Sequence, residues 1–357
     1  MAMIINHYLA REIVKPLVMV SAILVVIFAS YRSSDYLAEA TKGLLPMETV
    51  LNLIFLKLVI SLEMLLPTAL YLAVVVGLGR LYKDSEMIAL NALGVSELQI
   101  LKTVFRFSVI VAVVVCILSI YGRPWAYRIG YFLEAKAEAE FDISKMQAGH
   151  FFELADANRV LFARHIDREK GLMKDVFVQS DLGDATQVIY AREAYLPPLE
   201  LGDAPTLVFL NGSGYQLDRE GRRDRTLAFN KLTVHLDSER TADPGYKRKA
   251  ESTANLAKSE KPKEIAEFQW RLSTPLTTLI LGMLGVPLSR VPPREGSYGR
   301  LFVAVLVYAA FFNLTGMART WVEQGQVGAM PGIWWVHLLL SAALLLLVYY
   351  PLMRSKK

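Results

Sequence analysis

Long apolar runs at both ends of the sequence constrain its fold more than any other feature. A helix needs about 20 mostly apolar residues to cross the hydrocarbon core of a bilayer. Three such runs precede a long polar segment and three follow it, at residues 14–31, 51–78, 104–121, 268–288, 301–318 and 333–352. The composition agrees with a chain that lies largely in lipid, since 54% of the residues are hydrophobic and 20% are charged. We therefore predict an α-helical membrane protein with six transmembrane helices.

The basic residues of the short loops predict how these helices are oriented, because Lys and Arg are enriched in cytoplasmic loops. One side of the predicted bundle carries Arg11, Lys15, Arg80, Lys83, Lys102, Arg106, Arg290, Arg294, Arg300, Arg354, Lys356 and Lys357. The short loops of the other side carry Arg32, Lys42 and Arg319. Both termini are therefore expected in the cytoplasm. The central segment is expected on the opposite side of the inner membrane, which in a Gram-negative cell is the periplasm.

The central segment, residues 122–267, reads like part of a soluble protein. Between residues 146 and 236, short runs rich in β-branched and aromatic residues alternate with turn-forming residues. This pattern predicts an all-β sandwich or jelly roll, with turns at Pro197-Pro198 and Asn211-Gly212. Residues 243–263 are rich in Lys, Glu, Ala and Ser, which predicts a solvated helix or flexible linker. The expected organisation is three helices in residues 1–121, a periplasmic β-jellyroll domain and linker in 122–267, and three helices in 268–357.

The sequence lacks the motifs of common catalytic sites. It has no Gly-x-x-x-x-Gly-Lys-Ser/Thr, no His-Glu-x-x-His and no Gly-x-Ser-x-Gly motif. The net charge of +5 fits the basic loops of a membrane protein better than a nucleic-acid interface, because no basic aromatic module accompanies it. The single cysteine, Cys116, cannot form a disulfide within the chain. We expect a chain that is not an enzyme and that holds no cofactor or metal of its own.

Four arginines lie at or just beyond the outer ends of predicted helices, namely Arg32, Arg123, Arg128 and Arg319. Long basic side chains at such positions commonly extend to the headgroup region of the bilayer. Alternatively, they form a ring of guanidinium groups that holds an anionic lipid headgroup, because the planar guanidinium matches phosphate. Charge alone favours the first interpretation. We expect Glu63, inside the second run, to face the aqueous interface, with a proton-relay role as the alternative.

Residues 84–94, between the second and third runs, predict a short helix. Asp84 or Ser85 can cap it, Glu86 lies in its first turn and Gly94 ends it. The helix is apolar on most sides, whereas a solvated loop helix is amphipathic. It must therefore pack under its own bundle or dock into the groove of a partner. A cytoplasmic ATPase is the expected partner in the second case, because the chain has no ATP-binding motif.

Several segments together resemble the lipopolysaccharide export permeases of the LptF/LptG family. They are Ile4-Ile5-Asn6-His7-Tyr8-Leu9-Ala10-Arg11-Glu12, Leu78-Gly79-Arg80-Leu81-Tyr82, Asp84-Ser85-Glu86 with the residues up to Gly94, Gly122-Arg123-Pro124-Trp125 and Gly285-Val286-Pro287-Leu288-Ser289. The first and fourth of these segments are more similar to the LptF branch than to the LptG branch. The resemblance covers essentially the whole chain, and only the combination of segments is specific.

The resemblance implies a permease subunit of an ABC transporter that extracts lipopolysaccharide from the inner membrane. The lipid would then pass through the periplasmic β-jellyroll toward the outer membrane. The implied partners are an LptG-type permease in a heterodimer, an LptB-type ATPase dimer that binds ATP and Mg²⁺, LptC, and the periplasmic LptA bridge.

The resemblance also implies roles for individual residues. Contacts with the ATPase are implied for Glu86, with Asp84, Met87 and Leu90 beside it in the coupling helix. Lipid contacts are implied for Arg32 and Arg319, and we group Arg123 and Arg128 with them. Family members often have Lys at such positions, and Asp35 stands where a second basic residue can occur. The ring of cations is therefore expected to be thinner in this chain.

Aromatic residues of the predicted β domain are candidates for the lining of an acyl-chain groove. Phe151 and Phe152 are the first candidates, followed by Phe162, Phe177 and Phe209. The alternative, which residue type favours, is an ordinary sandwich core. Two other functions stay open from the sequence. One is a membrane subunit of a different ABC export system, and the other is a membrane-anchored scaffold or sensor.

Overall fold

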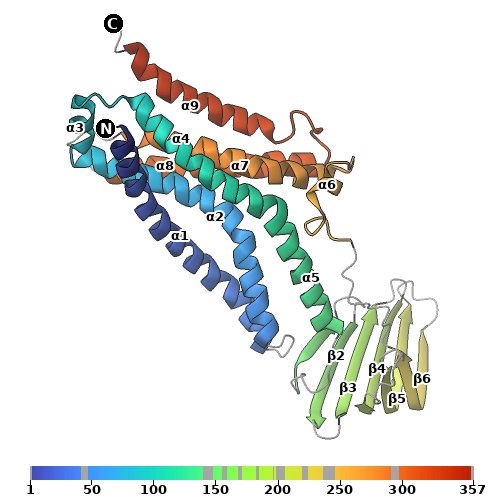
Figure 1. The fold of residues 1–357 in the computed structure, drawn as a ribbon. Helices are drawn as coiled ribbons and strands as arrows, with labels where there is room; N and C mark the ends of the chain where they lie inside the picture. Colours follow the sequence, from blue (N-terminus) through green and yellow to red (C-terminus); the bar gives the residue numbers. More distant parts are fainter. Residues whose placement is uncertain are drawn as a thin grey trace. The chain divides into compact units, whose positions relative to one another are not determined.

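The computed structural model describes residues 2–41, 47–139, 148–154, 159–167, 171–181, 185–195, 197, 206–218, 224–235, 246–290 and 297–354 (Figure 1). Of the residues used to predict orientation, Lys42, Arg294, Lys356 and Lys357 lie outside these ranges. The chain divides into two compact units. The first, which is helical, comprises Met1–Ser33, Leu53–Gly130 and Gly245–Lys357. The second, which contains the sheet, comprises Ser34–Asn52 and Tyr131–Pro244.

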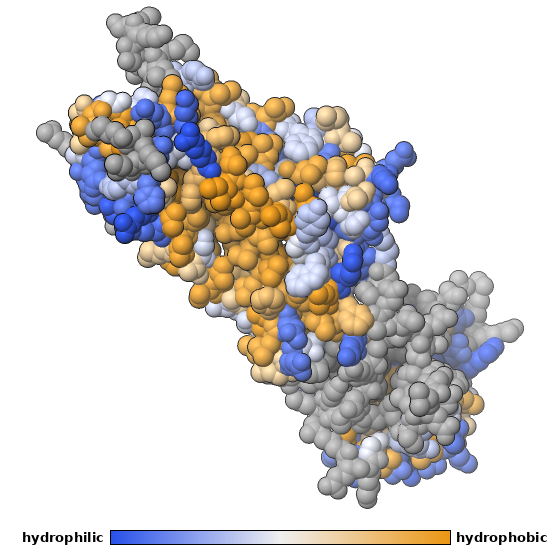
Figure 2. Space-filling view, viewed as in Figure 1, coloured by the Kyte–Doolittle hydropathy of each residue, from blue (hydrophilic) through white to orange (hydrophobic). Residues whose placement is uncertain are grey.

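Helices cover the six predicted apolar runs and extend beyond most of them. They are α1 (Ala2–Thr41), α2 (Met47–Lys83), α3 (Glu86–Ala92), α4 (Glu97–Ile117), the π-helix η1 (Leu118–Gly122), α5 (Arg123–Ala139), α6 (Thr253–Leu256), α7 (Pro262–Leu288), α8 (Ser297–Glu323) and α9 (Trp334–Arg354). Among the described residues, five stretches are long and apolar enough to cross a membrane: Ile5–Ser34, Met47–Lys83, Glu97–Lys136, Pro262–Leu288 and Gly299–Glu323. The apolar stretch of α9, Trp334–Tyr349, is shorter. Figure 2 shows a broad hydrophobic band over the bundle, with hydrophilic residues near α3.

Helix α7 is the central element of the helical unit. It contacts α4, η1, α6, α8 and α9, and its apolar stretch is the most buried of the five. Two glycines permit close packing. A Cβ added at Gly285 would lie 2.8 Å from Val74 Cγ1 of α2, and one added at Gly282 would meet the Ser108 hydroxyl of α4. Because small residues let transmembrane helices approach closely, α7 can gather side chains from its neighbours around itself.

A third glycine sets the contact between α1 and α2. A Cβ added at Gly77 would lie 2.6 Å from the backbone carbonyl oxygen of Glu12, closer than van der Waals contact allows. We expect Gly77→Ala to lower the free energy of unfolding by about 1–3 kcal/mol, the usual effect of overpacking. Gly79→Ala is the matched control, since its Cβ would lie 3.8 Å from the Ser289 carbonyl oxygen. Unfolding in detergent measures both variants, and equal stabilities would contradict the contact.

The segment before α7 is packed, which corrects the expectation of a solvated helix or flexible linker. Its described part, residues 246–261, contains α6, in which Leu256 is 1% exposed. Thr253 Oγ1 donates to the carbonyl oxygen of Ile120 at 3.1 Å. The expectation failed because the segment is held by long-range hydrogen bonds, which its polar composition does not reveal.

The second unit contains one antiparallel sheet with its strands in sequence order. They are β1 (Phe151–Leu154), β2 (Arg159–Asp167), β3 (Leu172–Asp181), β4 (Ala185–Tyr195), β5 (Thr206–Asp218) and β6 (Arg225–His235). Because each strand pairs with its neighbour in the chain, the described strands form a meander and not the two packed sheets of a jelly roll. The buried core of this sheet consists of Leu161, Ala163, Met173, Val176, Val178, Ile189, Ala191, Ala194, Leu207 and Phe209.

The alternation of buried residues is interrupted at one row of the sheet. In β3, Met173 and Val176 are both fully buried although they are three residues apart. Asp175 between them has a φ of +52°, and Asn211 in β5 has the same φ. A residue in this left-handed conformation interrupts the two-residue alternation of a strand, so that the side chains before and after it reach the same core.

The predicted turn at Asn211-Gly212 is therefore wrong, because both residues lie inside β5. A Cβ added at Gly212 would meet the carbonyl oxygen of Tyr190 and would lie 2.6 Å from Phe229 Cζ. Glycine is required here for the close approach of strands and not for a hairpin. The other predicted turn includes Pro198, which lies outside the described residues.

Candidate functional site

A π-helical turn positions the first side chain of the site. It covers Leu118–Gly122, and Arg123 begins α5 directly after it. Such turns within long helices are frequent at functional sites. Pro124 has no N–H to give to the carbonyl of Ile120, four residues earlier, and Thr253 Oγ1 donates to that carbonyl instead. The Arg123 side chain is thereby directed into the bundle, where the residue is 5% exposed.

Arg123 links two buried carboxylates. Its Nη1 donates to Glu63 Oε2 at 2.9 Å, and its Nε donates to Glu267 Oε1 at 2.9 Å. Both glutamates are 0% exposed. Glu63 also accepts hydrogen bonds from the hydroxyls of Ser119 and Thr274, at 3.0 and 3.3 Å. Since a buried charge is tolerated only when it is paired and hydrogen-bonded, these contacts explain why both carboxylates lie inside the bundle.

Arg271 of α7 is a second guanidinium of the site, and it is fully buried. Its Nε lies 3.3 Å from Glu267 Oε1. Its Nη1 donates to the Glu251 carbonyl oxygen at 2.8 Å, and its Nη2 donates to that of Lys249 at 3.0 Å. Arg271 therefore ties the segment before α6 to the bundle. With Arg123, it balances the charges of the two buried glutamates.

Arg319 of α8 connects these buried charges to the surface. Its Nη2 donates to Glu267 Oε2 at 3.0 Å and its Nε donates to Glu323 Oε1 at 2.9 Å. Its Cζ lies 4.7 Å from the ring centroid of Trp270, a cation–π contact. The Arg319 side chain is 18% exposed. It can thus meet a ligand from outside the bundle. We call the following residues the ion cluster: Glu63, Arg123, Glu267, Arg271, Arg319 and Glu323.

Lys249 lies beside the ion cluster and outside the membrane-spanning helices. Burial lowers the pKa of its ammonium group, and the positive charge of Arg123 lowers that pKa further. Glu267 acts in the opposite direction. Burial is the larger cause, so the shift indicates that the ammonium group of Lys249 is poorly solvated and close to Arg123.

The burial of Glu63 corrects the expectation that it faces the aqueous interface. Lys57, the nearest basic residue in the same helix, is six residues from Glu63 and therefore lies off its helical face. The actual counterion, Arg123, is 60 residues away in the chain. The partners that make burial possible therefore come from other helices.

Arg32 and Arg128, the other two arginines predicted to bind lipid, do not belong to the ion cluster. Arg123 and Arg319 both contact Glu267. Arg32 of α1 lies over the rings of Phe28 and Tyr31, with its Cζ 5.5 and 5.6 Å from their centroids. Arg128 is exposed on α5. The side chain of Asp35, the expected departure from the family pattern, lies outside the described residues.

The aromatic candidates of the sheet differ in exposure. Phe151 is 69% exposed, and its ring centroid lies 4.8 Å from that of Phe162. Phe162 is in register with Phe177 on the next strand. Phe209 is 1% exposed and belongs to the core. The side chain of Phe152 lies outside the described residues. Of these candidates, Phe151 is therefore open to solvent, whereas Phe209 packs inside the sheet's core.

The predicted coupling helix is α3, which is packed on one side and exposed on the other. Met87 is 1% exposed, and Leu90 packs against the same buried cluster. Ile88 and Leu93 are 55% and 62% exposed. The helix therefore packs on its own bundle and still presents an apolar surface, which we call the α3 surface.

The acidic residues at the start of α3 contact residues of the same unit. The hydroxyl of Tyr8 donates to the carboxylate of Glu86. Arg80 Nε lies 3.7 Å from Asp84 Oδ2. Ser85 occupies the N-cap position with a φ of 57° and makes no side-chain capping bond, so the predicted cap is not formed.

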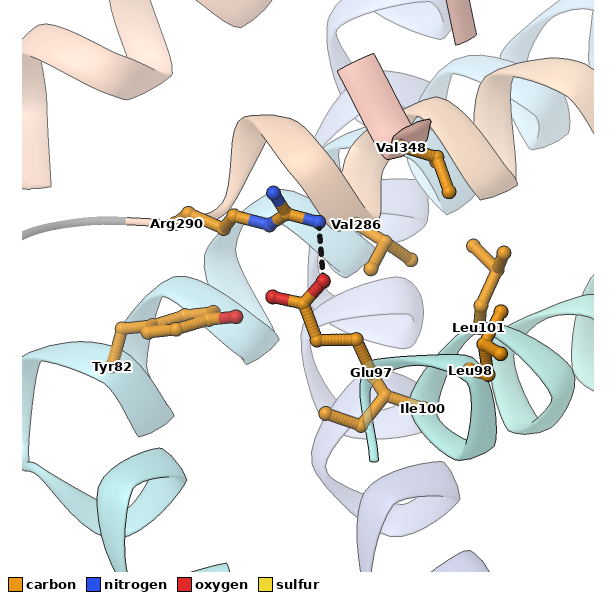
Figure 3. Close-up of a pocket in the computed structure, with 8 residues that line it drawn as sticks. All are labelled: Tyr82, Glu97, Leu98, Ile100, Leu101, Val286, Arg290 and Val348. Carbon is orange, nitrogen blue, oxygen red and sulfur yellow. Dashed lines mark hydrogen bonds and ion pairs between the residues drawn. The ribbon is translucent and has the colours of Figure 1, made fainter. Parts of the chain in front are cut away.

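An ion pair joins the residues after α3 to the end of α7. Ser96 caps α4 through a capping box, and Glu97 follows it. Arg290 Nη2 lies 2.9 Å from Glu97 Oε2, beside Tyr82 and Val286 (Figure 3). Glu267 lies near the other end of the same helix, whose 27 residues span about 40 Å. Helix α7 thus extends from the α3 region to the ion cluster.

Sequence reasoning missed Glu267, Arg271 and Glu323 as members of the site. A signal was present for Arg271, because it lies inside the fourth apolar run, where an ionisable residue is by default a functional candidate. Glu267 lies just before that run and Glu323 just beyond the fifth, so neither differs locally from a residue at the headgroup level.

Long apolar helices and a separate antiparallel sheet fit a membrane permease with an inserted β domain. The chain matches the family model of the lipopolysaccharide export system permease LptF/LptG over residues 7–350, and it belongs to this family. It is similar to the lipopolysaccharide export system permease protein LptF of Escherichia coli strain K12 and to that of Shigella flexneri. Each is 27% identical over 350 residues, which cover 97% of this chain and 94% of the relative. The resemblance drawn from the sequence is thereby confirmed, and the chain is a transport component and not an enzyme.

Proposed function

We propose that this chain is the LptF-type subunit of an ABC transporter that extracts lipopolysaccharide from the inner membrane. It pairs with an LptG-type permease, an LptB-type ATPase dimer that binds ATP and Mg²⁺, and LptC. The lipid passes to the β domain and then to a periplasmic LptA-type bridge. In this proposal α9 is the sixth span, both termini are cytoplasmic and the sheet is periplasmic. The positive-inside distribution of Lys and Arg supports this orientation.

The residue-level proposal rests on the contacts and the exposure of Arg319. Two carboxylates hold its guanidinium in place, yet 18% of the side chain remains exposed. A charged group fixed in advance by protein contacts loses little freedom when it binds a ligand. We assign Arg319 to the anionic headgroup of the lipid. Arg123 then acts by holding Glu267, and not by touching the lipid.

Extraction requires an external source of energy, because each methylene removed from the membrane costs about 0.8 kcal/mol. The α3 surface is suited to receive that energy from the ATPase. Its apolar residues Ile88 and Leu93 are exposed, while Met87 fixes the helix to the bundle. Motion of α3 would reach the ion cluster through the start of α4, which follows α3 in the chain, and through α7, to which the Glu97–Arg290 pair connects α4.

Reversing the charge of either partner tests this connection. The pair is partly exposed, with 42% and 22% of the two side chains accessible, so its loss should lower stability by no more than about 1 kcal/mol. We expect Glu97→Arg and Arg290→Glu each to lower lipid transfer per ATP hydrolysed several-fold. The double reversal should restore it. Single variants with normal coupling would remove this pair from the proposal.

Reconstitution in proteoliposomes tests the function itself. The chain is assembled with the partners named above and with lipopolysaccharide, and the transfer of lipid to a soluble LptA-type acceptor is measured. We expect transfer that requires both ATP and this chain. Transfer of phospholipid alone would favour a different ABC export system. Lipid transfer or ATP hydrolysis that does not respond to this chain would favour a scaffold or sensor.

A further inference from the structure

Two guanidinium groups converge on Glu323. Arg319 Nε donates to Glu323 Oε1 at 2.9 Å, and Arg248 Nη2 lies 3.2 Å from the same oxygen. Arg248 comes from the segment before α6 and Arg319 from α8, so two separate elements hold one carboxylate. A phosphoryl group between two arginines forms the same kind of charge-assisted hydrogen bonds. Glu323 therefore occupies a position that suits such an anion.

Arg248 retains hydrogen-bonding capacity beyond this contact. Its Nη1 is buried and has no partner within the part of the chain that the structure describes. A buried donor without an acceptor is unfavourable, and native structures contain few of them. A ligand oxygen at this position would satisfy the donor.

An open cavity of about 420 Å³ adjoins Arg248 and Glu323, and Arg319 contacts the lining residue Glu323. Arg248 and Glu323 line it together with Tyr246, Lys261, Pro262, Lys263, Glu264 and Gln324. Its size falls within the range of small-molecule sites. It also borders the first turn of α7, where the helix dipole favours a negative charge. The cavity therefore offers space for the anion beside the donors.

We propose that Arg248 and Lys261, which line this cavity, bind a phosphoryl group there, with Arg319 next to it through its contact with Glu323. Glu323 is an internal competitor that holds the two arginines when the phosphoryl group is absent. This inference rests on the proposed function, in which the substrate is an anionic lipid whose headgroup reaches this end of the bundle. It adds Arg248 to the residues that bind the headgroup. It also gives Glu323 the opposite effect, because Glu323 competes with the phosphoryl group for the arginines.

Substitutions of Arg248 and of Glu323 should change the affinity for a phosphoryl ligand in opposite directions. The full complex in detergent is titrated with phosphorylated lipid A, with the same lipid after removal of its phosphates, and with inorganic phosphate. We expect Arg248→Gln to weaken the binding of a phosphoryl ligand about tenfold, and Glu323→Gln to strengthen it by a similar factor. Arg248→Lys should fall between wild type and Arg248→Gln, since it keeps the charge and loses the planar fork. Lys258→Gln is the control, because it removes the same charge from an exposed position that does not line the cavity.

The pattern of results separates the possible explanations. Opposite shifts seen with lipid A and absent with the dephosphorylated lipid support a headgroup site. Opposite shifts seen with inorganic phosphate alone support the same phosphoryl site with free phosphate as its ligand. Weaker binding in both Arg248→Gln and Glu323→Gln, or no change in either, would overturn the proposal. Lipid transfer by the wild-type complex is measured in parallel, so a failure here is distinguishable from a failure of the proposed function.

Discussion

Glu267→Gln is expected to lower the free energy of unfolding by about 3–5 kcal/mol, the usual effect of removing one partner from a buried ion pair. Glu267 contacts Arg123, Arg271 and Arg319, at 2.9, 3.3 and 3.0 Å. The substitution keeps the shape of the side chain and removes its charge. Among the described residues, Arg123 would then keep Glu63 as its carboxylate partner, and Arg271 would lose the carboxylate with which it is paired. Unfolding of the purified protein in detergent measures the effect.

A double substitution distinguishes charge balance from side-chain shape. Glu267→Gln combined with Arg271→Met removes one charge of each sign, and it should recover part of the lost stability. The recovery will be incomplete, because Arg271 also donates to the carbonyl oxygens of Glu251 and Lys249. A Glu267→Gln variant with less than about 1 kcal/mol of lost stability would mean that the cluster is not held by this carboxylate.

Ile88→Asp is expected to lower ATP-dependent lipid transfer at least tenfold while leaving the fold intact. Ile88 is 55% exposed on the α3 surface, so its replacement should change the stability of the isolated chain by about 0.5 kcal/mol or less. In the proposed interface with the ATPase, the introduced aspartate would place an unpaired carboxylate in an apolar contact. Loss of a hot-spot residue at the centre of an interface weakens binding by about 2 kcal/mol or more, which exceeds a tenfold change. Transfer in proteoliposomes and copurification of the ATPase measure the effect.

Met330→Asp is the matched control for this prediction. Met330 is 82% exposed and lies between α8 and α9, so the variant adds the same charge at another exposed apolar position. We expect normal ATPase copurification from it. If Ile88→Asp also copurified the ATPase and transferred lipid normally, α3 would not be the coupling element.

The sequence predicted the helices well because crossing a membrane imposes a simple local rule. Each apolar run in the chain corresponds to a helix, and the short helix before Gly94 was found from its own residues. The β character of the central segment also followed from local composition. The strand boundaries could not be predicted from local composition. Asn211-Gly212 has the residue types of a turn, yet it lies inside β5, where neighbouring strands approach Gly212 closely.

The ion cluster was not predictable in the same way. Arg123 and Glu63 pair directly although they are 60 residues apart in the chain, and α7 adds Glu267 and Arg271 to the same cluster. Helix α7 is the least apolar of the five long spans and also the most buried. A search for apolar runs ranks such a helix last, although it lies at the centre of the bundle. An ionisable residue such as Arg271 inside a weakly apolar span is the signal that would have identified the centre of the site.

The most direct test of the account is photo-crosslinking to lipopolysaccharide from two positions in the assembled complex. A photoreactive amino acid is placed at Gln324, which is exposed beside the proposed headgroup site, and at Phe151, which is exposed on the sheet. Neither residue belongs to the ion cluster. We expect lipid adducts at Gln324 with or without ATP hydrolysis, and adducts at Phe151 only when ATP is hydrolysed. The absence of adducts at both positions, in a complex that is folded and hydrolyses ATP, would contradict the account.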